Sequence, residues 1–443
     1  MVSNKKWLEA VSPLSDPQPQ FDSSRSRSEV LLLPAVLYPV IIRINSNQLV
    51  VHSVPHAAIK RLDHGLRQGW RKPVIFTFSP RRHGTRLLHR YFLMIDLTRT
   101  ITASPDIHTV PTDPGKSWAD DVTVIIDAPP DRETEPAPEA TWATVDVRTG
   151  ICGSVTPRVV VLPNGQYRMY YTQMLPRPGF PAGAIDYDHC STRILSAVSS
   201  DGMTWVPEPG VRLSPQQGGA GDFRVVSPDI VPVSGEPGRL RMYYECCPGP
   251  QSIDNSIRSA VSDDGLSWAV EPGVRLETLD CHYSSCRIVF LEDGRSRMYV
   301  GQADCGIVSA ISKDGGVSFE IEDGIRVPMG DVYDKIVAFA PEILQIKSGG
   351  YRMYYAGYSA SNCAFILTAT SDDGFNWTKD MEPVISPGHS QFDKAKCSEI
   401  GILPLPTTDG QRPRYRLFYE ACDGTAQDER GVWRIIGRTT KKQ

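Results

Sequence analysis

The chain has 443 residues, of which 40% are hydrophobic and 22% charged, a composition that excludes a largely disordered protein. Its formal net charge of −4 provides no general attraction to nucleic acid or to a membrane surface. The 36 glycines and 36 prolines exclude a mostly helical bundle, because both residues disfavour helix interiors and favour turns.

Residues 1–112 contain no copy of the repeat described below, and we expect an irregular extension or cap there. The longest apolar run, residues 30–42, is shorter than the roughly 20 residues that a membrane-spanning helix needs. Residues 60–99 are rich in lysine and arginine. This charge favours either a basic cap that faces an anionic partner or a solvated extension.

Residues 1–22 lack the apolar core of a signal peptide, so no export signal is expected. The ten cysteines show no framework spacing, which favours reduced thiols in a cytoplasmic protein. Residues 113–140 are acidic and rich in proline, and we expect a linker there.

An internal repeat dominates residues 141–443. A five-residue landmark with a central Arg-Met or Arg-Leu pair occurs at Tyr167–Tyr171, Leu240–Tyr244, Ser296–Val300, Tyr351–Tyr355 and Tyr415–Tyr419. A second landmark, Asp-Gly followed by an aromatic residue, trails four of these copies, at Ser199–Trp205, Ser262–Trp268, Ser312–Phe319 and Ser371–Trp377.

The repeat predicts an all-β fold. Alternating β-branched and aromatic residues indicate strands, and Asp-Gly between two such runs indicates a hairpin turn. A unit of about 60 residues with four strands is typical of a propeller blade, so we predict a five-bladed β-propeller. The last unit contains only three strands, and Thr141–Gly150 is expected to supply the fourth and close the ring.

Charged residues stand at the head of each predicted inner strand, where the blades converge on the axis. They are Arg158, Asp229, Arg287, Glu342 and Glu399. Charges at the mouth of a channel are costly to desolvate unless they are paired or used. The set therefore predicts either a polar active site or an ionic network that closes the ring.

As an active site, this set predicts glycosidic cleavage by paired carboxylates, one acting as proton donor and the other as base or nucleophile. Asp229 and Glu342 are the expected acid/base pair, and Glu399 is the expected modulator. Arg158 and Arg287 are expected to bind an anionic group of the substrate, since arginine pairs with carboxylate or phosphate through two hydrogen bonds.

Loops at the same mouth add secondary candidates for substrate binding. Glu245 and Glu420 directly follow their Tyr-Tyr and Phe-Tyr landmarks, and His282 and His189 lie in mouth-side loops. The spacing of Cys281, His282 and Cys286 matches no zinc site. We expect no metal and no cofactor, because the sequence contains no phosphate loop or dinucleotide fingerprint.

The Tyr-Arg-Met-Tyr-Tyr landmark followed by Asp201-Gly202 and Trp205 resembles the five-bladed propeller enzymes of glycoside hydrolase families 43, 32 and 130. Ser312–Phe319 also resembles the Asp-box of sialidases. The resemblance implies that Asp229, Glu342 and Glu399 occupy the blade starts where families 43 and 32 place three acids. The first blade departs from those families because Arg158 replaces an Asp there. Family 130, which holds phosphate or polar sugar groups with arginines, is similar in that respect.

These observations predict a glycoside hydrolase or glycoside phosphorylase. Its expected partner is a small-molecule or oligosaccharide substrate, which is an anionic sugar or is cleaved with phosphate; no nucleic-acid or membrane partner is expected. Two alternatives stay open: a propeller recruited to a biosynthetic tailoring reaction on a non-sugar substrate, and a non-catalytic glycan-binding propeller.

Overall fold

The computed structural model describes residues 108–127, 153–176, 190–250, 253–276, 281–407, 411–424 and 432–441, together with the backbone of three strands before residue 54. The chain divides into two units, Met1–Ile101 and Thr102–Gln443. In the first unit, an antiparallel meander consists of β1 (Glu29–Pro34), β2 (Pro39–Asn45) and β3 (Gln48–Ser53). The basic stretch of residues 60–99 lies outside the described residues.

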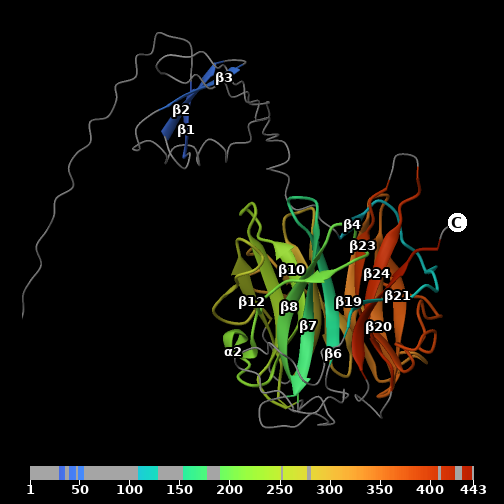
Figure 1. Cartoon of the computed structure of the whole chain (residues 1–443). Helices are drawn as coiled ribbons and strands as arrows, with labels where there is room; N and C mark the ends of the chain where they lie inside the picture. The colour runs from blue at the N-terminus through green and yellow to red at the C-terminus, as the bar shows by residue number, and fades with distance from the viewer. Residues whose placement is uncertain are drawn as a thin grey trace, which may run out of the picture. The chain divides into compact units, whose positions relative to one another are not determined.

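The strands of the second unit form three hydrogen-bonded sheets, of four, five and thirteen strands. We group these strands into five antiparallel segments, called blades one to five, and Figure 1 shows the labelled strands. Blade one contains β6 (Gly153–Val161), β7 (Tyr167–Pro176), β8 (Cys190–Ser199) and β9 (Val206–Pro207). Blade two contains β10 (Arg224–Pro232), β11 (Leu240–Cys247), β12 (Ser256–Ser262) and β13 (Ala269–Val270), preceded by the short helix α2 (Pro215–Gly218). Blade three contains β14 (Tyr283–Phe290), β15 (Ser296–Gln302), β16 (Gly306–Ser312), β17 (Glu320–Ile321) and β18 (Val327–Pro328).

Blades four and five complete the set. Blade four contains β19 (Val337–Ile346), β20 (Tyr351–Ala360), β21 (Cys363–Ser371) and β22 (Thr378–Lys379), with β4 (Thr109–Val110) beside β19. Blade five contains β23 (Lys396–Pro404), β24 (Tyr415–Cys422), β25 (Trp433–Thr439) and β5 (Thr123–Ile126).

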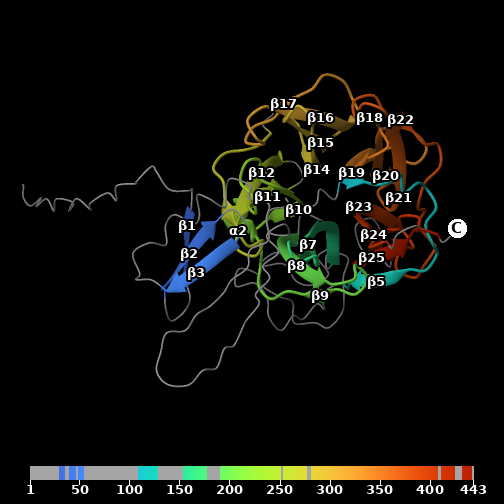
Figure 2. The same cartoon turned by 90° about the horizontal axis from the view of Figure 1, so that it is seen from above.

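The first strand of each blade lies innermost, and these inner strands form a closed cycle. Contacts run from β6 to β10, β14, β19 and β23, and from β23 back to β6. Figure 2 shows the blades placed around a common centre. The predicted all-β propeller class is therefore confirmed. Among the residues described, no helix has the length and apolarity that a membrane crossing demands.

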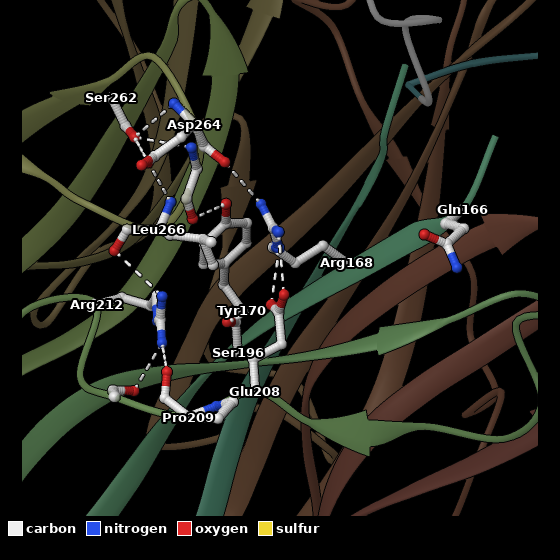
Figure 3. Close-up of polar contacts among 12 residues, drawn as sticks. Gln166, Arg168, Tyr170, Ser196, Glu208, Pro209, Arg212, Ser262, Asp264 and Leu266 are labelled. Carbon is white, nitrogen blue, oxygen red and sulfur yellow. Dashed lines mark hydrogen bonds and ion pairs between the residues drawn. The ribbon is translucent and has the colours of Figure 1, made fainter. Parts of the chain in front are cut away.

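The repeated landmarks hold neighbouring blades together, as Figure 3 shows for blades one and two. The Arg168 guanidinium donates to both carboxylate oxygens of Glu208 and, at 3.1 Å, to the Asp264 carbonyl in the turn of the next blade. The Tyr170 hydroxyl donates to the neighbouring Gly265 carbonyl at 2.7 Å. Equivalent contacts are made by Arg241, Tyr243, Arg297 and Tyr299. The arginine landmark therefore links blades.

The Asp-Gly turn of blade five comes from a distant part of the chain. Asp113-Pro-Gly-Lys-Ser-Trp118, which precedes the first blade, occupies the place that the Asp-Gly turn has in the other blades. The Tyr354 hydroxyl donates to the Gly115 carbonyl at 2.6 Å, as Tyr170 does to Gly265. The Trp118 ring packs edge-on to Tyr354 at 6.2 Å, as Trp268 packs against Tyr170 at 5.7 Å.

This arrangement differs from the linker expected over residues 113–140. Residues 113–126, which belong to the expected linker, supply both the turn and the outer strand β5, which pairs with β25. Thr141–Gly150, the expected closing strand, lies outside the described residues. The ring then closes through Trp205 of blade one, which packs against Phe418 of blade five at 5.5 Å.

The displaced turn makes Trp118 a stability determinant. Replacing Trp118, which is 4% exposed, by alanine is expected to lower the free energy of unfolding by about 3–5 kcal/mol, because it removes a large buried ring. Chemical denaturation of the full chain measures the change. Met381→Ala, at an 83% exposed side chain, is the control and should change the stability little. Equal effects of the two substitutions would contradict the role given to residues 113–118.

Candidate active site

A bulge interrupts every inner strand at the same level. Pairing with the second strand shifts by one residue after Val155, Val226, Ser284, Phe339 and Ser398. The next residue, which we call the bulge position, is Thr156, Ser227, Ser285, Ala340 or Glu399 in blades one to five. The first four have φ between 51° and 55°, a strained region for residues with a side chain. Such strain is concentrated at functional sites, and here the amides of Thr156 and Ser285 donate to glutamate side chains.

Four of the five charges predicted at the axis meet in a buried group, the hub cluster, two residues beyond the bulge position. Arg158 Nε lies 2.7 Å from Asp229 Oδ1, and Arg158 Nη1 lies 3.0 Å from Glu342 Oε2. Arg287 Nε lies 2.9 Å from the same Glu342 oxygen. All four residues are at most 1% exposed. Two guanidinium groups therefore match two carboxylates.

Backbone and histidine contacts complete the hub cluster. Asp229 Oδ2 accepts a hydrogen bond from the Ile288 amide at 2.8 Å, and Arg287 donates to the Ile400 carbonyl at 3.2 Å. The Arg158 guanidinium also contacts the His108 ring, which comes from the segment before β4. The predicted arginine clamps and the predicted acid/base pair thus bind one another, and none of the four lines the pocket described next.

Glu399 is not in register with the hub cluster. Each member of the hub cluster pairs with the fourth residue of its own blade's five-residue landmark. In blade five, the fourth residue is Phe418, and it pairs with Gly401 instead of Glu399. A Cβ on Gly401 would lie 2.8 Å from the Pro157 carbonyl oxygen. The close approach of blade one therefore leaves no room for a fifth charged side chain at this level, and Glu399 belongs to the bulge position.

An axial pocket of about 380 Å³ opens beside the bulge positions, and all five blades contribute to its wall. Its polar lining includes Glu245, Glu399, Glu420, Arg224, Lys396, His282, Asn255, Thr156, Ser227 and Ser285. Its apolar lining includes Val155, Met174, Val226, Val337, Phe339, Tyr358 and Trp433. A largely apolar cavity with a few convergent polar groups is typical of a small-molecule site.

Glu245 and Glu420 hold equivalent positions, each directly after a Tyr-Tyr or Phe-Tyr pair, and each accepts an N–H from the bulge of the next blade. Glu245 Oε2 accepts from the Ser285 amide at 3.3 Å, and Glu420 Oε2 accepts from the Thr156 amide at 3.0 Å. Glu245 Oε1 also accepts from Asn255 Nδ2 at 2.6 Å.

Hydroxyl groups surround the third carboxylate. Glu399 accepts hydrogen bonds from Ser285 Oγ at 3.0 Å and from Ser227 Oγ at 3.2 Å. Ser285 therefore joins two carboxylates, since its amide binds Glu245 and its hydroxyl binds Glu399. The three glutamates are 5–6% exposed.

Burial changes the protonation of all three glutamates. It raises the pKa of Glu245 to about 7, and the neighbouring Glu399 charge adds to the shift. Burial, with the charge of Glu399, also raises the pKa of Glu420 well above its ordinary value. The pKa of Glu399 is raised by burial too, but the Arg287 charge and the two serine hydroxyls oppose that shift. Burial thus favours the protonated form of these carboxyl groups, and Glu399 differs from the other two because a nearby guanidinium and two hydroxyls favour its ionised form.

Basic side chains form a further level nearer the start of the inner strands. Arg224 stands two residues before Val226, which pairs with Glu245. Lys396 stands two residues before Ser398, which pairs with Glu420. His282 stands at the equivalent place in blade three, two residues before Ser284. Arg224 and Lys396 are each 1% exposed and line the pocket. His282 lies 3.5 Å from Asp254, and His189 lies outside the described residues.

All three pocket glutamates are among the residues predicted from the sequence, whereas Arg224 and Lys396 are not. Their common level becomes visible only when the inner strands are aligned on their bulges. In the described part of the chain, no group of three His, Cys, Asp or Glu side chains is arranged to hold a metal ion. The nine cysteines of that part are free thiols.

Comparison with known proteins supports the fold assignment. No family model matches the chain, and no curated protein matches it. A solved structure described as "Glycoside hydrolase" is similar with a TM-score of 0.52 and 17% identity, over 72% of this chain and 93% of that one. A candidate glycoside hydrolase from Parabacteroides distasonis gives 0.51 and 14%, over 78% and 99%. A candidate glycosidase from Bacteroides thetaiotaomicron gives 0.50 and 14%, over 77% and 97%. At these identities the likeness establishes the propeller fold.

Proposed function

We propose that the protein is a carbohydrate-active enzyme that cleaves a glycosidic bond in the axial pocket. The observation that carries the proposal is the set of three buried glutamates, Glu245, Glu399 and Glu420, on the wall of one pocket at the centre of the ring. Glycosidic cleavage needs a protonated carboxyl group on the leaving oxygen and an ionised carboxylate at the sugar or at a water molecule. The fold similarity to proteins described as glycoside hydrolases adds support.

The environments of the glutamates favour different roles. Glu245 is the proton donor in this proposal, since a pKa of about 7 lets it release and regain a proton near neutral pH. Glu399 is the base or nucleophile, because two serine hydroxyls and the Arg287 charge favour its ionised form. Glu420, whose pKa burial raises well above its ordinary value, stays protonated in this proposal and limits the negative charge of the pocket.

Asp229 and Glu342 take no part in proton transfer in this proposal. Their carboxylates bind arginines inside the hub cluster, where a substrate has no access. A reducing compartment such as the cytoplasm suits the free thiols of the described residues and belongs to the same proposal.

Incubation with a panel of 4-nitrophenyl glycosides and reducing oligosaccharides tests the proposed activity. We expect the full chain to release product from at least one substrate. The variant Glu245→Gln/Glu399→Gln/Glu420→Gln should lose that release while it keeps the thermal unfolding temperature within a few degrees. Glu236→Gln, at an exposed side chain outside the pocket, is the matched control and should retain full activity. Product release by the triple variant at the wild-type rate would overturn the proposal.

A further inference from the structure

Basic side chains at one level of the axial pocket indicate the charge of its ligand. We propose that the pocket takes a saccharide with an oxyanion group, and that Lys396 and Arg224 hold this group. The inference rests on the proposed function, because it names the substrate class for the same pocket. The sequence predicts that Arg158 and Arg287 bind the anion, whereas this inference gives that role to two residues at a different level of the ring.

Position and burial support these two residues. Lys396 begins β23 and Arg224 begins β10, so rigid inner strands of blades five and two present them to the same cavity. Both are 1% exposed, and Arg224 Nη2 donates to the Gly249 carbonyl at 3.0 Å, which orients the guanidinium. A buried cationic side chain attracts an anion more strongly than an exposed one, because water screens its charge less.

Two aromatic rings lie close to the Lys396 ammonium group. Lys396 Nζ lies 5.5 Å from the centre of the Tyr358 ring and 5.4 Å from that of Trp433, within the range of cation–π attraction. Both rings also line the pocket, and Phe339 packs against Tyr358 at 5.8 Å. The apolar face of a sugar ring can pack on these aromatic side chains while its acidic substituent meets the ammonium group.

The protonation of the pocket glutamates also favours an anionic ligand. The Lys396 charge lowers the pKa of Glu420, but burial outweighs this effect and keeps the pKa high. Glu245, with a pKa of about 7, is also partly protonated near neutral pH. The pocket wall therefore repels an oxyanion less than three ionised carboxylates would, while both basic side chains attract it.

The anion has two possible sources, a carboxylate on the sugar and free phosphate that attacks the glycosidic bond. Calorimetric titration of the full chain with D-glucuronate, D-galacturonate, D-glucose and inorganic phosphate distinguishes them. We expect a uronate to bind more tightly than D-glucose. If inorganic phosphate binds and neither uronate does, oxyanion recognition is also supported. The recognised anion is then the phosphate that attacks the glycosidic bond.

Matched variants connect the binding to the named residues. Lys396→Met and Arg224→Met should each weaken binding of the anion by about 10–100-fold, the effect of one hydrogen bond to a charged group. Lys335→Met, at an exposed lysine, should leave it unchanged. Absence of anion binding, or binding that neither pocket variant weakens, would overturn the inference. Cleavage of neutral glycosides without anion binding would refute this inference alone, whereas Lys396-dependent uronate binding without any cleavage would refute only the proposed function.

Discussion

Glu245→Gln is expected to lower kcat/KM for a glycoside with an alkyl leaving group by about 10²–10⁴-fold, the usual contribution of general acid catalysis. Glutamine keeps a hydrogen-bonding side chain beside Asn255 and the Ser285 amide but cannot release a proton. With a 4-nitrophenyl leaving group, which departs without protonation, the loss should be much smaller. Glu399→Gln should lose both activities, since the base or nucleophile is needed for either leaving group.

The pH dependence of the wild type gives a second readout. A proton donor works only while it is protonated, so kcat/KM should fall as the pH rises through the Glu245 pKa of about 7. Glu245→Gln should lack this descending limb, and Glu236→Gln should retain it. A descending limb in Glu245→Gln, or equal losses on the two leaving groups, would contradict the assignment of Glu245 as proton donor.

Arg158→Met is expected to lower the free energy of unfolding by about 3–5 kcal/mol. The substitution leaves the buried Asp229 and Glu342 carboxylates without their shared guanidinium, and an uncompensated buried charge is strongly destabilising. Denaturant unfolding of the full chain measures the change. Arg295→Met is the control because Arg295 pairs with Asp293 at the surface, where water and salt screen the ion pair and its loss changes stability little.

This stability prediction also separates the hub cluster from the pocket. Asp229→Asn should destabilise the protein, since it removes the charge that faces Arg158. The pocket variants should instead change activity with a small effect on stability. An Arg158→Met protein as stable as Arg295→Met would show that the hub cluster does not hold the inner strands together.

The repeat made the fold largely predictable, because each landmark performs the same structural task in successive blades. Arg168 and Tyr170 of one blade contact Asp264 and Gly265 in the turn of the next blade. Each copy of the arginine landmark therefore needs a turn in the following blade. The turn of blade five was not predictable in this way. In Asp113–Trp118 a proline separates the Asp from the Gly whose carbonyl accepts from Tyr354, and this segment precedes the first blade although it serves the last one.

The site was less predictable because its levels depend on the bulges. In sequence, Ser398-Glu399 aligns with Pro228-Asp229, which places Glu399 beside the hub cluster. The pairing of Ser398 with Glu420 and of Gly401 with Phe418 instead places Glu399 at the bulge position, on the pocket wall. Hydrophobic periodicity contains no information about the strained φ of Ser227 or Ser285, whose hydroxyls orient the Glu399 carboxylate.

The most direct test is a crystal structure of the full-length Glu245→Gln variant with an intact oligosaccharide identified by the substrate panel. We predict that the glycosidic oxygen lies within about 2.6–3.2 Å of the side-chain amide at position 245, with Glu399 facing the anomeric carbon. A saccharide seated on the outer face of the blades, or one whose glycosidic oxygen contacts Asp229 or Glu342, would contradict the account.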